Sequence, residues 1–255
     1  MSPLTEPTKL TLAKGQPVPV DLNYSNVSLL LHGNGTNGST TIVDNSPTPK
    51  TVTAAGDAKI STAQSKFGGS SIAFDGSGDN LQSLTPLNPQ LNLSTGDFTV
   101  EAWVYLSAAP VNTANNNSSM MGWGTLSDTT EAWSFGPLNN RTVRFYWFIG
   151  GGNSVTSSTL VNLSEWVHLA ATRSGNTLRI FINGVDSGSE SITGIVDISQ
   201  SPLLFGRVTL NGGFNGYIDD LRITKGVARY TSNFTHPPHL FRTSSHDTQR
   251  NRRHY

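Results

Sequence analysis

The sequence predicts an all-β protein built as a sandwich or barrel of short strands. Apolar and polar residues alternate over short runs, Gly and Asn separate these runs, and no long window shows a helical period. Charged residues make up only 13% of the chain, against a usual share of ~25%. With 255 residues, the chain has room for one large all-β domain or two small domains.

The expected strands begin near residue 28 and continue to residue 223. The turn residues Gly175 and Asn176 join two of them into a hairpin, and Asn183-Gly184 is a second hairpin-turn signal. Hairpins build antiparallel sheets, and two such sheets must cover each other to bury their apolar faces. In chain order, the expected strands are 28–33, 51–61, 70–76, 97–106, 142–150, 165–173, 178–184, 202–208 and 217–223.

The strand expected at 97–106 shows the alternation most clearly. One of its faces is apolar and is expected to face the core, whereas Glu101, Trp103 and Tyr105 lie on the opposite face. A face that is both aromatic and polar is typical of a concave sheet surface or of a sheet covered by a loop. The residues of the expected core face are Phe98, Val100, Ala102, Val104 and Leu106.

The two ends of the chain differ from its centre. Residues 1–25 are expected to form an extended arm, because prolines interrupt helices and central strands. Residues 26–240 form the expected domain. Residues 241–255 form an expected C-terminal tail in which four arginines accompany a single acid, Asp247. The prolines of the arm are Pro3, Pro7, Pro17 and Pro19.

The composition excludes several classes of site and partner. The chain has no cysteine, so disulfides, thiolate nucleophiles and cysteine-ligated metals are excluded. The 17 basic residues balance the 17 acidic residues, and we expect no sequence-specific nucleic-acid partner. No apolar run approaches the ~20 residues that span a bilayer, so we expect no membrane insertion. The N-terminus lacks the pattern of a secretory signal.

Four motifs occur along the chain in the order SSIAFDGSGDNL, DFTVEAWVYL, EWVHLAATRSGNTLRIFINGV and GYIDDLRITKGVARYTSNF. Together, over residues 27–238, they resemble the laminin-G-like branch of the concanavalin A-like lectin/glucanase fold. This resemblance implies a jelly-roll sandwich of two antiparallel sheets. The closing phrase GVARYTSNFTHPP is similar to copies found in bacteriophage virion proteins, notably those of marine and cyanobacterial phages.

The pattern of acids along the chain disfavours an enzyme. Glucanases of this fold place several acids two residues apart on one strand, so that their carboxyl groups reach the same bond. Glu101 has no such companion, because Trp103 and Tyr105 occupy the next two positions on its face. We therefore expect no enzymatic activity, and a glycoside hydrolase is the last of the alternatives. His168 is expected to be packed or hydrogen-bonded rather than a catalytic base.

Calcium is the one cofactor that the sequence suggests. Ca²⁺ takes six to eight oxygen ligands, and the resemblance implies a site at the rim of the sandwich. The expected ligands are Asp44, Asp75, Asp79 and Asp219, with Asn45 beside the first. The alternative is that these residues form Asx turns, in which the side chain hydrogen-bonds to its own backbone.

Two adjacent aspartates fall within the last expected strand. A strict period of two places Asp219 on the inward face with Leu221, where it needs hydrogen bonds or a cation. We expect it to be a structural residue first and a calcium ligand second. The same period places Asp220 on the opposite face, beside Arg222 as its expected partner.

Glycan binding is expected from aromatic side chains with polar neighbours, because sugar rings stack on aromatic faces while polar groups bond the hydroxyls. The alternative is that the tryptophans belong to the core. The expected glycan-binding residues are Trp123, Trp133, Tyr146, Asn139 and Asn140.

The leading hypothesis is a bacteriophage virion structural protein, a capsid decoration or a tail or fibre component, that displays a lectin-like sandwich and could bind host-surface polysaccharide. Residues 1–25 and the C-terminal tail would contact other virion proteins, and the chain would form a homo-oligomer. It would be assembled in the host cytoplasm and reside in the virion. The alternative is a soluble carbohydrate-binding module, with or without Ca²⁺.

Overall fold

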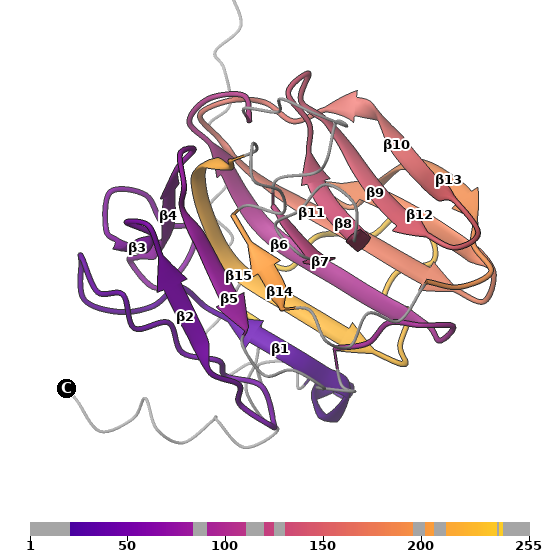
Figure 1. Ribbon diagram of the computed structural model, residues 1–255, viewed down its shortest axis with the longest axis horizontal. Helices are drawn as coiled ribbons and strands as arrows, with labels where there is room; N and C mark the ends of the chain where they lie inside the picture. Colours follow the sequence, from indigo (N-terminus) through magenta and orange to yellow (C-terminus); the bar gives the residue numbers. More distant parts are fainter. Residues whose placement is uncertain are drawn as a thin grey trace, which may run out of the picture.

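The chain forms an all-β sandwich of two antiparallel sheets, as predicted (Figure 1). The strands run antiparallel in every pair of named strands within the described residues. A short 3₁₀ turn, Tyr24–Asn26, precedes the first strand. This computed structural model describes residues 21–83, 91–110, 120–124, 131–195, 202–206, 213–238 and 240–241, without the side chains of residues 123, 124 and 131.

Sheet A contains β15, the longest strand among the described residues, and β15 pairs with three other strands. It pairs with β6 on one side, and on the other side it pairs first with β4 and then with β1. In spatial order, sheet A contains β13 (Val185–Ser191), β12 (Thr177–Ile182), β11 (Trp166–Ser174), β6 (Phe98–Leu106), β15 (Asn215–Lys225), β4 (Ser71–Asp75) and β3 (Lys59–Ser61), with β1 (Val27–Leu31) beside β15.

Sheet B covers one face of sheet A (Figure 1). Its strands β8, β9 and β10 form a continuous antiparallel meander, since each pairs with the next in sequence. In spatial order, sheet B contains β10 (Gly152–Leu160), β9 (Thr142–Phe148), β8 (Glu131–Pro137), β7 (Met121–Gly124), β14 (Leu203–Phe205), β5 (Asn80–Ser83) and β2 (Val52–Ala55).

The hydrophobic core lies between the two sheets. Phe98 of β6 stacks on Phe145 of β9 with ring centroids 5.7 Å apart, and Phe145 also stacks on Trp133 of β8. The predicted core face of β6 is confirmed, since all five of its apolar residues belong to this core. The Gly175–Asn176 hairpin is also confirmed, because Ser174 pairs with Thr177 across the turn.

The segment 51–61, predicted as one strand, is divided between the two sheets. Its first half is β2 of sheet B and its second half is β3 of sheet A. The break falls at Gly56, whose φ of 70° is accessible to glycine at little cost, and at Asp57. This crossing between sheets leaves Asp57 at the rim of the sandwich.

The two adjacent aspartates of β15 sit at a β-bulge, and the predicted faces of this strand are wrong for that reason. Asp219 pairs with Trp103 and Arg222 pairs with Glu101, so one extra residue is inserted between them. Asp220 has a φ of 50°, as expected for a bulge residue. Asp219 therefore lies on the face of Trp103, away from the core that contains Leu221.

The expected ion pair between Asp220 and Arg222 is also wrong. The Asp220 carboxylate contacts His32 Nδ1 at 2.6 Å and accepts a hydrogen bond from the backbone N–H of Phe241 at 2.6 Å. Arg222 instead donates to Glu101 and to Asp21. The bulge turns both aspartates toward segments that cover the outer face of sheet A, which is the face away from sheet B.

A closing segment, residues 226–238, lies over the centre of this outer face. Two rings pack against the ring of Trp103. The ring centroid of His236, in the closing segment, lies 4.9 Å from that of Trp103, and the ring centroid of Phe67, in the loop before β4, lies 5.9 Å from it. Trp103 is only 1% exposed as a result. Of the two explanations for the aromatic and polar face of β6, a covering segment is therefore the right one at Trp103.

Both ends of the predicted domain extend slightly further than expected. Asp21, from the predicted arm, pairs with Arg222 at 3.0 Å and with Arg229 at 2.9 Å. Phe241, from the predicted tail, lies 3.6 Å from the Arg222 guanidinium and is buried. The remainder of the arm, 1–20, and of the tail, 242–255, lies outside the described residues.

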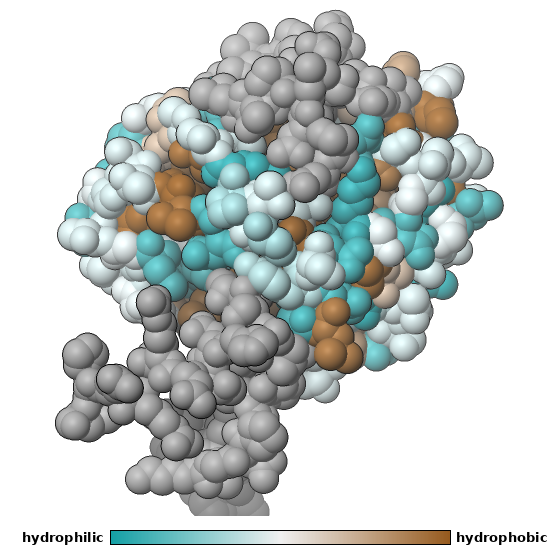
Figure 2. Space-filling model, turned by 90° about the horizontal axis from the view of Figure 1, so that it is seen from below, coloured by the Kyte–Doolittle hydropathy of each residue, from teal (hydrophilic) through white to brown (hydrophobic). Residues whose placement is uncertain are grey.

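The surface of the described residues is largely polar. Figure 2 shows one face of the molecule, on which small brown patches are separated by teal and white residues. No helix among the described residues has the length and apolar character that crossing a bilayer requires.

Candidate functional site

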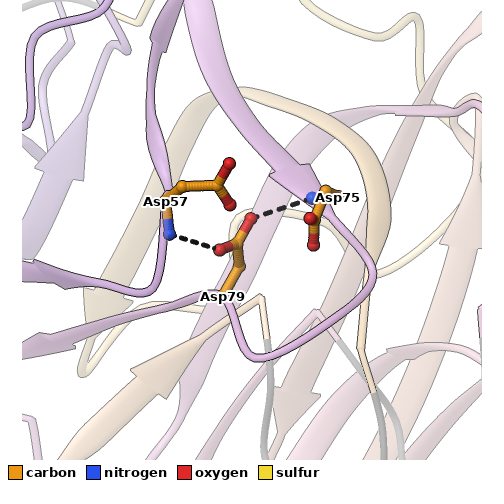
Figure 3. A group of neighbouring side chains, drawn as sticks. All are labelled: Asp57, Asp75 and Asp79. Atoms are coloured by element: carbon orange, nitrogen blue, oxygen red, sulfur yellow. Dashed lines mark hydrogen bonds between the residues drawn. The ribbon is translucent and has the colours of Figure 1, made fainter.

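Three aspartates meet at the rim of the sandwich, and we call them the acidic trio: Asp57, Asp75 and Asp79. Each offers one carboxylate oxygen, and these oxygens all lie within 4.8 Å of one another. Asp79 is buried between the other two, which are exposed (Figure 3). The trio is assembled from the crossing between β2 and β3, from the end of β4, and from the turn that follows β4.

Backbone hydrogen bonds hold the trio in place. Asp79 accepts from the N–H of Asp57 at 2.7 Å and from the N–H of Asp75 at 2.9 Å, as Figure 3 shows. Asp75 in turn accepts from the N–H of Ser77 at 2.7 Å. The predicted Asx-turn role of Asp75 is thus observed, and it coexists with a carboxylate cluster.

Two carboxyl groups of the trio have pKa values that are shifted in opposite directions. Burial raises the pKa of Asp79, against the effect of its two backbone hydrogen bonds. The pKa of Asp57 is lowered, first by a hydrogen bond with the Asp79 side chain and then by the nearby Lys59 ammonium. A bound cation would compete with a proton for the Asp79 carboxylate.

The donor set of the trio fits a hard divalent cation. Carboxylate oxygens are the ligands that Ca²⁺ prefers, and each oxygen that accepts one N–H keeps a second lone pair. The two exposed carboxylates leave room for water molecules to complete the six to eight ligands of Ca²⁺. Asp57, Asp75 and Asp79 are therefore the residues that would hold the ion.

The other two predicted calcium ligands lie elsewhere. Asp44 is buried and accepts hydrogen bonds from the N–H groups of Leu30, Ser46 and Lys50. It therefore has the turn-forming role that was the alternative for it. Asp219 accepts from the N–H groups of residues 66 and 67 at 2.8 and 3.0 Å. Neither belongs to the group that could hold a metal.

A pocket of about 260 Å³ adjoins the acidic trio, and we call it the rim pocket. Its lining residues Lys59, Ala73 and Tyr217 are paired neighbours on the outer face of sheet A. Asn215 lies opposite Asp75 in the pairing of β15 with β4, and the N–H of Ser107 bonds the Asn215 carbonyl at 3.0 Å. The walls include the trio, Lys59, Ser107, Asn215 and Tyr217.

The rim pocket combines three kinds of group that polyhydroxylated ligands require. Carboxylate, amide and hydroxyl groups form a polar row along Asp75, Asn215 and Ser107. Tyr217 lies two residues beyond Asn215 on the same face of β15 and supplies an aromatic ring. Two other hollows, near residues 25–28 and 40–54, contain no aromatic lining residue.

Among the described side chains, the predicted glycan-binding residues do not form one site. Trp133 is 1% exposed and stacks on Phe145 within the core, so it cannot offer a face to a sugar. Tyr146 lies on the other face of sheet B, half-buried, beside the Arg144 guanidinium at 5.6 Å. Asn139 and Asn140 are exposed in the turn before β9, at the opposite end of that strand. The side chain of Trp123 lies outside the described residues.

Glu101 sits in a closed ionic network rather than in a cleft. Its carboxylate accepts from Arg222 at 2.7 and 2.9 Å and from the Tyr230 hydroxyl at 2.8 Å. His168 Nε2 lies 3.2 Å away, in agreement with the packed role predicted for this histidine. Burial alone would raise the pKa of Glu101, but Arg222 and His168 outweigh it and lower the pKa to about 2.

The sequence reasoning missed Asp57, Asn215, Ser107 and Tyr217. Gly56-Asp57 was a visible turn signal within the segment predicted as one strand, and the tyrosine shares the period-two face of the predicted strand 217–223. What the sequence could not show is the pairing of β4 with β3 and β15, and of β15 with β6, which brings these residues beside Asp75 and Asp79.

The fold and these motifs agree with one known family. The family model described as the concanavalin A-like lectin/glucanases superfamily, in its laminin-G-like branch, matches residues 74–229, which is more than half of the chain. No curated protein sequence matches this chain.

Solved structures with the same fold include domain 4 of AbnA, a GH43 extracellular arabinanase from Geobacillus stearothermophilus, in complex with arabinotriose. It is 16% identical, with a TM-score of 0.60, over 80% of this chain and 94% of that domain. The binding domain of botulinum neurotoxin DC in complex with SialylT is 17% identical, with a TM-score of 0.54. The binding domain of botulinum neurotoxin serotype D is 15% identical, with a TM-score of 0.56.

This chain spans about half of each neurotoxin binding domain, 49% in both cases, and 80% of its own length is aligned. At sequence identities of 15 to 17%, the similarity between these structures and this chain is a similarity of fold. Because its fold is a two-sheet antiparallel sandwich and the family model matches more than half of its sequence, this chain belongs to the concanavalin A-like lectin/glucanases superfamily.

Proposed function

We propose that this protein is a carbohydrate-binding domain and that the rim pocket is its binding site. The observation that supports this most strongly is the polar row of Asp75, Asn215 and Ser107 beside the Tyr217 ring, in one open pocket. Binding sites for sugars combine an aromatic face, on which a ring stacks, with a few fixed polar groups that bond its hydroxyls.

Calcium would strengthen the same site. When bound by the acidic trio, Ca²⁺ supplies a fixed positive charge beside the pocket and a Lewis-acidic contact for sugar hydroxyl oxygens. Without the ion, the two exposed carboxylates and the buried one leave the rim negatively charged, with Lys59 as the cation at 3.5 Å from Asp57.

Two of the structural neighbours agree with this proposal. The arabinanase domain was solved in complex with arabinotriose, and one neurotoxin binding domain in complex with SialylT. The neurotoxin domain is described as a binding domain. We extend the same function to this chain, and we propose binding without hydrolysis, since Glu101 is enclosed in an ionic network.

Screening the protein against immobilised neutral and acidic polysaccharides, with calcium and with a chelator, tests this function. We expect binding to at least one polysaccharide, weakened by Asp75→Asn and Asn215→Ala, with no shortening of the glycan. Glu190→Gln, at an exposed acid on β13, is the matched control and should bind normally. Binding that is absent in every condition, or that persists in both rim variants, would contradict the proposal.

The closing segment is similar in sequence to segments of bacteriophage virion proteins, and this similarity supports one location for the protein. We propose that the domain is displayed on a bacteriophage particle, as a homo-oligomer, toward host-surface polysaccharide. Mass spectrometry and antibody labelling of purified particles test this location. An absence of the chain from particles would leave the soluble carbohydrate-binding module as the function.

A further inference from the structure

A row of three aromatic side chains continues from the rim pocket across the outer face of sheet A, and we call it the aromatic row: Tyr217, Tyr105 and Trp166. Tyr217 of β15 pairs in register with Tyr105 of β6, and Tyr105 pairs with Trp166 of β11. The ring centroids are 5.8 Å apart in the first pair and 5.7 Å apart in the second. All three side chains are half-buried.

The aromatic row is half-buried, whereas the next row along the same strands is covered. The next row along the same strands is Asp219, Trp103 and His168, and each of these residues is fully buried or nearly so. His236 and Phe67 contact Trp103 directly. Core formation does not explain the aromatic row, since Tyr217, Tyr105 and Trp166 point away from the core between the sheets.

The polar row lies parallel to the aromatic row, two residues further along the strands. Asn215 precedes Tyr217 by two residues on β15, and Ser107 follows Tyr105 by two residues after β6. Side chains two residues apart share a face and lie ~7 Å apart along a strand. A sugar that contacts the aromatic row therefore has amide, hydroxyl and carboxylate groups of the protein along one of its edges.

The spacing of the aromatic row suits a chain of sugars rather than a single sugar. Neighbouring strands lie ~4.8 Å apart, and the observed ring spacings of 5.8 and 5.7 Å are close to the length that one pyranose unit adds to an extended chain. The planes of neighbouring rings are inclined by 74° and 58°, so the row offers ring faces and ring edges in turn, and a chain that crosses the strands can contact Trp166, Tyr105 and Tyr217 in succession.

Without a bound cation, the charges around this surface select against anionic sugars. The acidic trio lies at one end, and Glu165, exposed next to Trp166, lies at the other end. Lys59 extends the aromatic row on β3, but it already pairs with Asp57. Uronic or sialic acid units would meet like charge at both ends of the row.

We propose that the ligand is a neutral, extended oligosaccharide that lies across the strands of sheet A, contacts Trp166, Tyr105 and Tyr217, and ends in the rim pocket. This inference rests on the proposed function and adds the ligand class, its direction and the residues that hold it. Affinity should rise with each added sugar unit until the aromatic row is filled.

Calorimetric titration with a length series of the neutral oligosaccharide found by screening tests the inference. Tyr105→Ala should weaken the longest ligand by about ten-fold and should flatten the dependence on length. Tyr105→Phe keeps the ring and should bind within about two-fold of the native protein. Phe148→Ala, at an exposed aromatic residue of sheet B, is the matched control and should bind normally.

The outcomes separate this inference from the proposed function. If the protein binds glycans but Tyr105→Ala and Trp166→Ala bind as the native protein does, the aromatic row is overturned and the rim pocket alone remains. Loss of binding in Tyr146→Ala instead would move the site to sheet B. Stronger binding of an anionic oligosaccharide in the presence of chelator would overturn the neutral ligand class. A protein that binds no glycan overturns both proposals.

Discussion

At the residue scale, Asp219 has a carboxylate whose two oxygens have different surroundings. Oδ2 accepts hydrogen bonds from the N–H groups of Lys66 and Phe67, whereas Oδ1 is buried without a hydrogen-bond partner among the described residues. Burial is the main reason that the pKa of Asp219 rises to about 7. Ionisation of this group therefore opposes folding.

Replacing Asp219 by Asn should stabilise the protein in a pH-dependent way. Because its pKa is raised in the folded state, the native protein loses stability as pH rises from the unfolded value of 3.8 to about 7. The variant does not ionise, so its stability advantage should be greater at pH 8 than at pH 5, on the order of 2 kcal/mol. Urea unfolding at the two pH values measures this, and an equal difference at both would contradict it.

Proton release should accompany metal binding at the acidic trio. Burial raises the pKa of Asp79, so acidification protonates a carboxylate that the cation needs. We expect calcium affinity to fall as the pH is lowered, because protons compete with the cation for the Asp79 carboxylate. Calorimetry in two buffers of different ionisation enthalpy reports both the affinity and the released proton. Affinity that does not change with pH would rule out the trio as the site.

At the element scale, the predictable strands are those with clear apolar alternation. The sequence predicted β6, β9, β11 and β12 because their core faces are continuous. It missed β5, β7, β8, β10 and β13. Of these, β10 and β13 are largely polar and exposed, and each is an edge strand of its sheet. The bulge in β15 was also invisible, because it arises where β15 changes partner from β4 to β1 and no single strand contains that information.

Two hairpin glycines offer a test of how the closing segment is held. Gly184 has a φ of 80°, and a Cβ on it would lie 2.0 Å from the carbonyl oxygen of Phe234 in the closing segment. Gly175 has a φ of 57°, and a Cβ there would meet nothing within 4 Å. Both glycines therefore share the conformational requirement, and only Gly184 also contacts the closing segment.

Gly175→Ala should cost about 1 kcal/mol of unfolding free energy, because alanine is strained at positive φ. Gly184→Ala should cost at least about twice as much, since it also displaces Phe234, whose N–H bonds the Gly184 carbonyl at 2.8 Å. Chemical unfolding measures the cost, and limited proteolysis shows whether the closing segment is released. Equal costs in the two variants would mean that the closing segment is not anchored at this turn.

At the scale of the whole molecule, one ionic network ties distant parts of the chain together. Asp21 precedes β1, Glu101 lies on β6, Arg222 lies on β15 and Arg229 lies in the closing segment. All four side chains are largely buried. The sequence did not predict this network, because its members are brought together only by sheet pairing.

Asp21→Asn should destabilise the protein by about 3 kcal/mol, because it leaves two buried arginines with less compensating charge. Asp186→Asn removes a more exposed ion pair with Arg179, 3.7 Å long, and should cost less than about 1 kcal/mol. Thermal unfolding of the two variants compares them. A cost for Asp21→Asn no larger than that of its control would show that the network does not join the N-terminal segment to the sheet.

The central claim is that the outer face of sheet A binds a neutral glycan through the rim pocket and the aromatic row. The most direct measurement is a calorimetric titration of the native protein and of Tyr105→Ala with the same neutral oligosaccharide. The account predicts binding by the native protein and a loss of about ten-fold in the variant. Equal affinity of the two proteins for that oligosaccharide would contradict it.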